Sequence, residues 1–197
     1  QVAREPAAGQ FAIDGDRRVA LADDPAGRTV EVTTRERWME IEAPDVEVGG
    51  FTMRHAASRA QHGALQAARG ADRLAVSDVL LEDAHAALIS FQDVTDASLV
   101  DSVLRRGGQL AVHAGGGGTQ GLTIARNQLL DSNTEGFDSA WEAGGLKAAL
   151  ATGLVMEDNV VTGSDGPGLW CDIDCKDVTY ARNRVHHNSG AGIFFEI

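Results

Sequence analysis

The stretches GLVMEDNVVTGSDGPGLWCDI (153–173) and DVTYARNRVHHNSGAGIFFEI (177–197) decide the fold of this chain. Each contains two apolar residues at positions i and i+2, an Asn at i+5 and an apolar residue at i+7. A Gly-rich turn follows, and then a second apolar run that leads to an acid, Asp172 or Glu196. Corresponding residues lie 24 positions apart. A pattern that recurs at a fixed spacing of this size predicts stacked structural repeats.

Earlier parts of the chain carry the same pattern with decreasing clarity. GLTIARNQLLDSN (121–133) is a clear copy, whereas 97–114, 73–91 and 46–55 are degenerate copies. The matching apolar positions are separated by 28, 23, 25, 32 and 24 residues, and they are Val48, Val76, Leu99, Ile124, Met156 and Tyr180.

A period near 24 with three short strand-like runs per copy is typical of a coil wound from parallel β-strands. Leucine-rich repeats have a similar length, but these copies lack their L-x-x-L-x-L-x-x-N signature and a helical side. An antiparallel sandwich would have no reason to keep the same order of three strands. The sequence therefore predicts an all-β parallel solenoid.

The Asn residue of each copy has a physical role in such a coil. Asn tolerates left-handed backbone conformations, and stacked Asn side chains can hydrogen-bond from one coil to the next. We expect Asn127, Asn159 and Asn183 to form a ladder at one corner, continued by Ser102.

With these repeats, and with the motif G-x-G-[LI]-[WF]-x-[DE]-I in the last two coils, residues 44–197 resemble the right-handed parallel β-helix proteins of the pectate-lyase-like superfamily. The resemblance implies a right-handed parallel β-helix of about five to six coils. Residues 1–43 are expected to form an N-terminal β cap, with short strands joined by a turn around DDPAG (23–27). Because the chain stops at Ile197 in mid-strand, we expect a truncated helix whose open edge favours self-association.

Strand alternation also predicts which side chains fill the coil. Eight residues of the last two coils are expected to be buried: Leu154, Met156, Val161, Leu169, Val178, Tyr180, Val185 and Ile193.

Composition narrows the classes of function. The formal net charge of −12 argues against binding to bare nucleic acid or to an anionic membrane, and no apolar run has membrane-spanning length. The two cysteines, Cys171 and Cys175, lie too far apart for a disulfide in an extended strand, whereas a turn between them would allow one. The sequence leaves both alternatives open.

The same alternation places Trp170, Asp172, Phe194 and Glu196 on the outside of the coil, as two neighbouring aromatics beside two neighbouring acids. We expect Lys147 to lie in register with Trp170, and His113 with Asp172. An exposed row of aromatic side chains lowers the solubility of a protein unless something covers it. Two neighbouring carboxylates repel each other unless a proton, a cation or a substrate reduces the repulsion. This face is therefore the predicted site.

In the family that the chain resembles, this strand and the loop before it form a polysaccharide groove. The one insertion in the repeats, DSNTEGFDSAWEAGG (131–145), lies in that loop and offers Trp141 and Glu142 for a wall of the groove. The histidines of the degenerate early copies, His55, His62 and His85, are interpreted as structural or solvated.

These features favour a secreted, extracellular carbohydrate-active protein that binds a polysaccharide. A glycoside hydrolase would use Asp172 and Glu196 and no cofactor. A polysaccharide lyase would need Ca²⁺ on Asp172, Asp174 and Glu196, with Lys147 or His113 as the base, although Lys147 is favoured as an ion-pair partner. A non-catalytic adhesin, surface or structural module is the alternative outside enzymes.

Overall fold

The structure is a computed structural model that describes residues 5–16 and 18–196. These residues form 21 β-strands and no helix, so the described chain has no helix long and apolar enough to cross a membrane. The chain divides between Val32 and Thr33 into two compact units, a small N-terminal unit and the solenoid.

The N-terminal unit contains an antiparallel hairpin of β1 (Phe11–Ile13) and β2 (Val19–Leu21). The connection between the two strands lies between Ile13 and Val19 and not at DDPAG, where the sequence analysis expected the turn. Asp14 explains the difference, because its carboxylate accepts hydrogen bonds from the backbone N–H groups of Asp16 and Arg18 (2.8 and 2.9 Å). An Asp-Gly pair such as Asp14–Gly15 is a strong hairpin signal.

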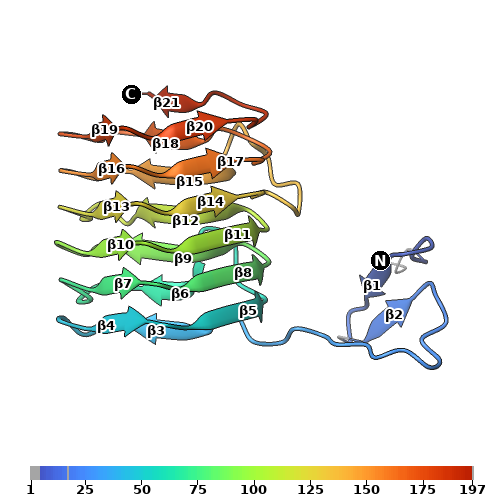
Figure 1. The fold of residues 1–197 in the computed structure, drawn as a ribbon. Coiled ribbons are helices and arrows are strands. Elements are labelled where there is room, and N and C mark those ends of the chain that lie inside the picture. Colours follow the sequence, from blue (N-terminus) through green and yellow to red (C-terminus); the bar gives the residue numbers. More distant parts are fainter. Residues whose placement is uncertain (1–4, 17, 197) are drawn as a thin grey trace. The chain divides into compact units, whose positions relative to one another are not determined.

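The solenoid is built from three parallel sheets, and each coil contributes one strand to each sheet in turn (Figure 1). The first sheet contains β4 (Glu47–Gly49), β7 (Ala75–Ser77), β10 (Ser98–Val100), β13 (Thr123–Ala125), β16 (Val155–Glu157) and β19 (Thr179–Ala181). The second contains β5 (Thr52–Ala56), β8 (Leu80–Ala84), β11 (Val103–Gly107), β14 (Gln128–Leu130), β17 (Val160–Thr162) and β20 (Arg184–His186). The third contains β3 (Met39–Ile41), β6 (Gly63–Ala67), β9 (Ala87–Gln92), β12 (Leu110–Gly115), β15 (Gly144–Ala149), β18 (Leu169–Asp172) and β21 (Ile193–Phe195).

The predicted fold class is confirmed, with a small difference in the number of coils. Six complete coils follow β3, which makes about seven turns where the sequence analysis expected five to six. The first solenoid strand, β3, lies within the segment 1–43 that was expected to form the cap.

The register between coils agrees with the repeat that the sequence shows. All six positions used to measure the period pair with one another along the first sheet: Val48, Val76, Leu99, Ile124, Met156 and Tyr180. The 32-residue step between Ile124 and Met156 holds the extra loop, which leaves this register unchanged.

The predicted asparagine ladder lies at the corner between the first and second sheets. The backbone N–H of Asn127 donates to Oδ1 of Asn159 (3.0 Å), and the N–H of Asn159 donates to Oδ1 of Asn183 (3.1 Å). Ser102 continues the ladder, because its N–H donates to Oδ1 of Asn127 (3.0 Å). The Nδ2 groups of Asn127 and Asn159 also donate to the carbonyls of Leu99 and Ile124, so the corner has few unpaired polar groups.

The left-handed residue at this corner is the one before each ladder position. Arg126, Asp158 and Arg182 have φ of 57°, 55° and 53°, whereas the ladder asparagines do not have positive φ. The side chains of these corner residues alternate in charge from coil to coil. Arg126 forms two hydrogen bonds with Asp101 (both 2.7 Å), and Arg182 forms two with Asp158 (both 2.8 Å). These pairs favour one register between coils, since a shifted coil would separate the opposite charges.

The interior of the coil confirms most of the predicted core. Four of the predicted residues are fully buried: Leu154, Met156, Val161 and Leu169. Three more are partly buried and pack against this core: Val178, Tyr180 and Val185. Ile193 is 49% exposed, so its predicted burial is wrong. It pairs with Leu169 as expected, but no later coil in the described chain covers it.

The ladder generates a prediction about stability. Replacing the buried Asn159 by Ala removes the acceptor of the Asn127 N–H and the donor to the Ile124 carbonyl. Since each buried polar group left unpaired costs about 1–3 kcal/mol, we expect Asn159→Ala to lower the free energy of unfolding by about 2–5 kcal/mol in urea denaturation. The control is Gln128→Ala at the exposed neighbouring position, expected within about 0.5 kcal/mol of wild type. Equal effects of the two changes would contradict a stabilising ladder.

The paired positions Leu169 and Ile193 offer a second test of the fold. Leu169→Ala creates a cavity in a closed core, so we expect a loss of about 2–5 kcal/mol in the free energy of unfolding. Ile193→Ala at the same position of the next coil removes half-exposed surface, and we expect a loss below about 1 kcal/mol. Denaturant midpoints of the two variants measure the difference, and an equal loss would show that the register or the burial is wrong.

Candidate functional site

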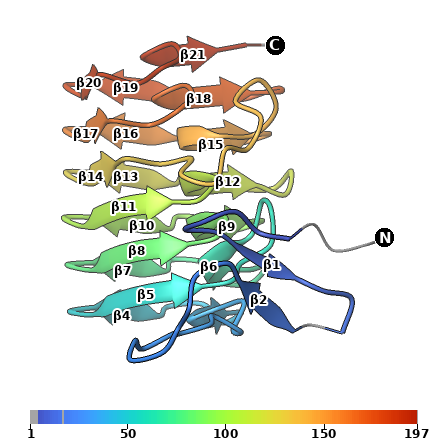
Figure 2. The ribbon, with the colours of Figure 1, turned by 90° about the vertical axis from the view of Figure 1, so that its right-hand side faces the viewer.

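The third sheet receives one strand from each coil (Figure 2). Its outward face carries two columns of side chains, one residue per coil. The first column consists of Gln66, Ser90, His113, Lys147, Trp170 and Phe194. The second column lies two residues further along each strand and consists of Gln92, Gly115, Ala149, Asp172 and Glu196. The aromatic pair and the acid pair predicted from the sequence therefore occupy neighbouring columns.

His113 does not lie where the sequence analysis expected it. It pairs with Lys147, in the column of Trp170, and not with Asp172. The partner of Asp172 is Ala149, and the corresponding residue of β12 is Gly115. The loop inserted between β14 and β15 interrupts the repeat, so the spacing of the copies does not fix the register of β12 against β15.

The inserted loop is held in one conformation by Asn133 and Asp138. The Asn133 side chain donates to the carbonyls of Phe137 (2.9 Å) and Asp165 (2.8 Å) and accepts from the N–H of Phe137 (2.7 Å). The Asp138 carbonyl accepts from the N–H groups of Trp141 and Glu142 (both 3.0 Å). This turn places Trp141 and Glu142 over the third sheet.

Lys147 joins the loop to the sheet. Its ammonium donates to Glu142 (2.9 Å), to Asp172 (2.8 Å) and to the backbone carbonyl of Trp141 (2.6 Å). It also lies 3.8 Å from the centroid of the Trp170 ring, in a cation–π contact. Because three acceptors take its three protons, and because the residue is 4% exposed, Lys147 is placed as an ion-pair partner and not as a free base.

Glu142 is the loop side of this buried network. Burial alone would raise its pKa, but the hydrogen bonds and charges of His113 and Lys147 outweigh this effect and hold the pKa below its ordinary value. Nε2 of His113 lies 3.3 Å from the Glu142 carboxylate, while Nδ1 of His113 is buried without a hydrogen-bond partner in the described chain.

The aromatic row is less exposed than the sequence analysis expected. Trp170 is 2% exposed, because Lys147 lies over its ring and Phe194 packs against it with a centroid distance of 5.4 Å. Its indole N–H donates to Glu196 (3.2 Å). Trp170 therefore supports the acids of the site, and the exposed aromatic ring is that of Trp141, which is 48% exposed.

An open groove with a volume of about 520 Å³ runs over this surface. The second column supplies Gln92, Gly115, Ala149, Asp172 and Glu196, and the loop supplies Trp141 and Glu142. Since each of those five column residues belongs to a different coil, the groove follows the axis of the solenoid.

The sequence analysis placed neither Gln61 nor His62 in the groove, and it gave no role to Gln109, which connects the two sides of the groove. Gln61 and His62 line the groove from the segment before β6, although His62 had been interpreted as structural or solvated. Gln109 is fully buried and connects the segment before β6 with the inserted loop. Its Oε1 accepts a hydrogen bond from the N–H of Gln61 (2.8 Å), and its Nε2 donates one to the carbonyl of Glu142 (2.7 Å). These residues lie in turns outside the repeated strand pattern, which therefore carries no signal for them.

The proposed calcium ligands are not arranged as a ligand set. Asp172 is paired with Lys147, and Asp174 is paired with Lys176 (2.9 Å) on the exposed turn. Within residues 5–16 and 18–196, no group of three or more His, Cys, Asp or Glu side chains is positioned to hold a metal ion. In this structure Asp172 and Asp174 therefore each face an ammonium group.

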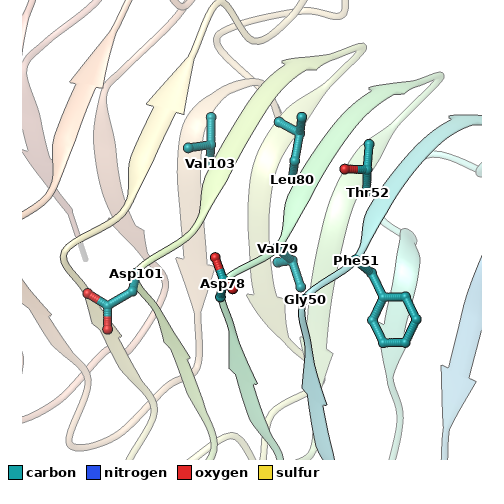
Figure 3. Close-up of a pocket in the computed structure, with 8 residues that line it drawn as sticks. All are labelled: Gly50, Phe51, Thr52, Asp78, Val79, Leu80, Asp101 and Val103. Atoms are coloured by element: carbon teal, nitrogen blue, oxygen red, sulfur yellow. The ribbon is translucent and has the colours of Figure 1, made fainter.

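A smaller hollow of about 300 Å³ lies at the corner between the first and second sheets (Figure 3). Its lining combines Val79, Leu80 and Val103 with the carboxylates of Asp78 and Asp101. Asp101 is held by Arg126, and the residues that line the hollow include no buried charged side chain. The groove on the third sheet is the better candidate site for this reason.

The fold and the groove define a parallel β-solenoid protein with one organised outer face. A family model described as a right-handed β-helix region matches residues 65–197, which is more than half of the chain. The chain therefore belongs to the right-handed β-helix family, and the resemblance to the pectate-lyase-like superfamily is consistent with this result. No curated protein and no solved structure matches the chain.

The lowered pKa of Glu142 predicts part of the pH dependence of stability. A carboxyl group whose pKa is lower in the folded than in the unfolded chain stabilises the fold above its ordinary value of 4.5, and this stabilisation is lost as the pH falls. In Glu142→Gln, the free energy of unfolding should therefore fall less steeply than in wild type between about pH 5 and pH 3.

The control for this measurement is Glu135→Gln in the same loop. Its side chain is 53% exposed, so we expect the pH profile to keep the slope of wild type. Urea titrations at several pH values measure both profiles. An unchanged slope in Glu142→Gln would show that the buried network does not hold this carboxylate in its charged form.

Proposed function

We propose that the protein binds a polysaccharide along the groove of the third sheet and hydrolyses it with Asp172 and Glu196. The observation that carries this proposal is the placement of the two carboxylates at the same position of neighbouring coils, beside the exposed ring of Trp141. Sugar rings stack on aromatic faces, and carboxylates accept hydrogen bonds from sugar hydroxyls. Gln61 and Gln92 add amide groups to the same groove.

The spacing of the two acids favours a retaining mechanism. Neighbouring parallel strands lie about 4.8 Å apart, and retaining glycosidases keep their two carboxyl groups about 5–5.5 Å apart. The inverting mechanism needs a wider separation, of about 6.5–9.5 Å, to leave room for a water molecule.

The surroundings of each acid suggest its role. Asp172 is held by the Lys147 ammonium at 2.8 Å, which fixes the orientation of its carboxylate and suits the role of nucleophile. Glu196 accepts a hydrogen bond from the neutral indole of Trp170 and is partly exposed, which suits an acid that gives and takes a proton. In this scheme an oxygen of Asp172 attacks the anomeric carbon while Glu196 protonates the departing glycosidic oxygen. Glu196 then removes a proton from the water that releases the sugar from Asp172.

A lyase mechanism has less support from the same residues. Lys147 already donates to three acceptors, so it has no free lone pair with which to remove a proton. His113 faces Glu142 with Nε2, and the three acids proposed for calcium do not form a ligand set.

A second candidate function is glycan binding without catalysis, as in an adhesin or a surface module. The observation that favours it is that both groove acids already have partners, Asp172 in an ion pair and Glu196 in a hydrogen bond. Either function places the protein outside the cell, where polysaccharides are exposed, and we propose an extracellular location on this ground.

The test is a panel of soluble polysaccharides, assayed for new reducing ends and for the absorbance of unsaturated products. We expect reducing ends without absorbance, and we expect Asp172→Asn and Glu196→Gln each to lower the rate by at least about a hundredfold. The matched control is Asp174→Asn, an exposed acid outside the groove lining, which should keep the wild-type rate. Binding without any new ends would favour the second candidate, and full activity of both groove variants would refute the proposed roles.

The two groove variants should differ in stability. Asp172→Asn leaves the buried Lys147 ammonium with one carboxylate, so we expect a loss of about 1.5–3 kcal/mol in the free energy of unfolding. Glu196→Gln keeps an acceptor for the Trp170 indole, and we expect its melting temperature to stay close to that of wild type. Thermal unfolding measures both, and equal melting temperatures would contradict the importance of the Lys147–Asp172 pair.

A further inference from the structure

We infer that the groove selects a glycan without acidic groups and binds amine-bearing sugars, such as glucosamine oligomers, most tightly. This inference rests on the proposed function and names the substrate class of the same site.

The groove lining is acidic. It contains three carboxylates, Glu142, Asp172 and Glu196, and one ammonium, that of Lys147. The lining residues of the described chain include no arginine. A ligand in the groove therefore meets an excess of negative charge in addition to the net charge of −12 of the whole chain.

The single ammonium is not available to an acidic sugar. Its three donated bonds go to Glu142, Asp172 and the carbonyl of Trp141, and the side chain is 5% exposed. A uronate would therefore bring its carboxylate next to Asp172 and Glu196 without a free cation to balance it. Like charges at this separation disfavour binding.

The two imidazoles in the lining do not change this balance. His113 points Nε2 at the Glu142 carboxylate and is 7% exposed, so a charge on it would be neutralised within the protein. His62 lies on the opposite side, in the segment that Gln109 joins to the loop, and offers one partly exposed imidazole.

The exposed acids explain the preference for an amine. Glu196 is partly exposed and its partner is the uncharged indole of Trp170, so its charge is not balanced by that contact. An ammonium on a sugar that stacks on Trp141 would bring a positive charge next to Asp172 and Glu196, which offsets part of the excess negative charge of the lining. A neutral sugar would gain the stacking and the hydroxyl hydrogen bonds without this positive charge.

The experiment compares three unbranched tetrasaccharides in calorimetric titrations with the whole chain: a glucosamine tetramer, a glucose tetramer and a galacturonate tetramer. Titrations are made at a pH where the amine is protonated, and mass spectrometry checks that each sugar stays intact. We expect the glucosamine tetramer to bind at least tenfold more tightly than the glucose tetramer, and the galacturonate tetramer not to bind. The advantage of the amine should shrink at high salt.

Two variants distinguish binding in the groove from nonspecific attraction to the negatively charged chain. Glu196→Gln should reduce the affinity for the glucosamine tetramer to about that of the glucose tetramer. Asp174→Asn removes an acid outside the groove lining and should leave all three affinities unchanged. Equal losses in the two variants would show adsorption to an acidic surface and would overturn the inference.

The outcomes distinguish this inference from the proposed function. If the galacturonate tetramer binds as tightly as the others, or if amine and glucose tetramers bind equally, the inference on substrate class fails while glycan binding stands. If none of the three tetramers and no polysaccharide of the panel binds, the proposed function fails as well.

Discussion

The structure depends on the register between successive coils. Backbone hydrogen bonds between parallel strands allow several registers, because a shift by two residues keeps the same faces inside and outside. The corner removes this freedom, since the side chain of Asn159 must meet both the N–H of Asn127 and the carbonyl of Ile124. Alternating charges at the same corner, such as Asp101 with Arg126, favour the same arrangement. Because the register is fixed, equivalent residues of successive strands pair with one another and form the columns on the outer face.

The groove is the consequence of one interruption in this regular stack. The loop between β14 and β15 leaves the register of the first sheet unchanged, yet it adds a wall over the third sheet. Buried charges hold that wall in place, because Lys147 bonds to Glu142 in the loop and to Asp172 in the sheet. Gln109 connects the wall to the segment on the other side of the groove. The same ion pairs that build the site also use its one ammonium, and this leaves the groove acidic.

The repeat pattern predicts pairing within clear strand copies and fails next to the inserted loop and at the last coil. The pattern placed Lys147 beside Trp170 correctly, because both lie within clear strand copies. It placed His113 two residues out of register, beside Asp172 and not beside Lys147. The inserted loop before β15 interrupts the repeat, so the spacing does not fix how β12 pairs with β15. It also predicted an exposed Trp170, although side chains from both neighbouring coils, Lys147 and Phe194, cover the ring. Ile193 pairs as predicted but is exposed, since burial depends on the coil above as well as on the register.

The sequence alone determined the all-β parallel solenoid, the ladder of Asn127, Asn159 and Asn183, and the position of the two acids on neighbouring coils. These features follow from a period near 24 and from strand alternation, which are local rules that each coil repeats. The tertiary structure decided how the loop folds back, which charges pair, and which segments meet at Gln109. Such contacts join residues far apart in the chain, with no repeat relating them, and their geometry is defined only when the coils are stacked.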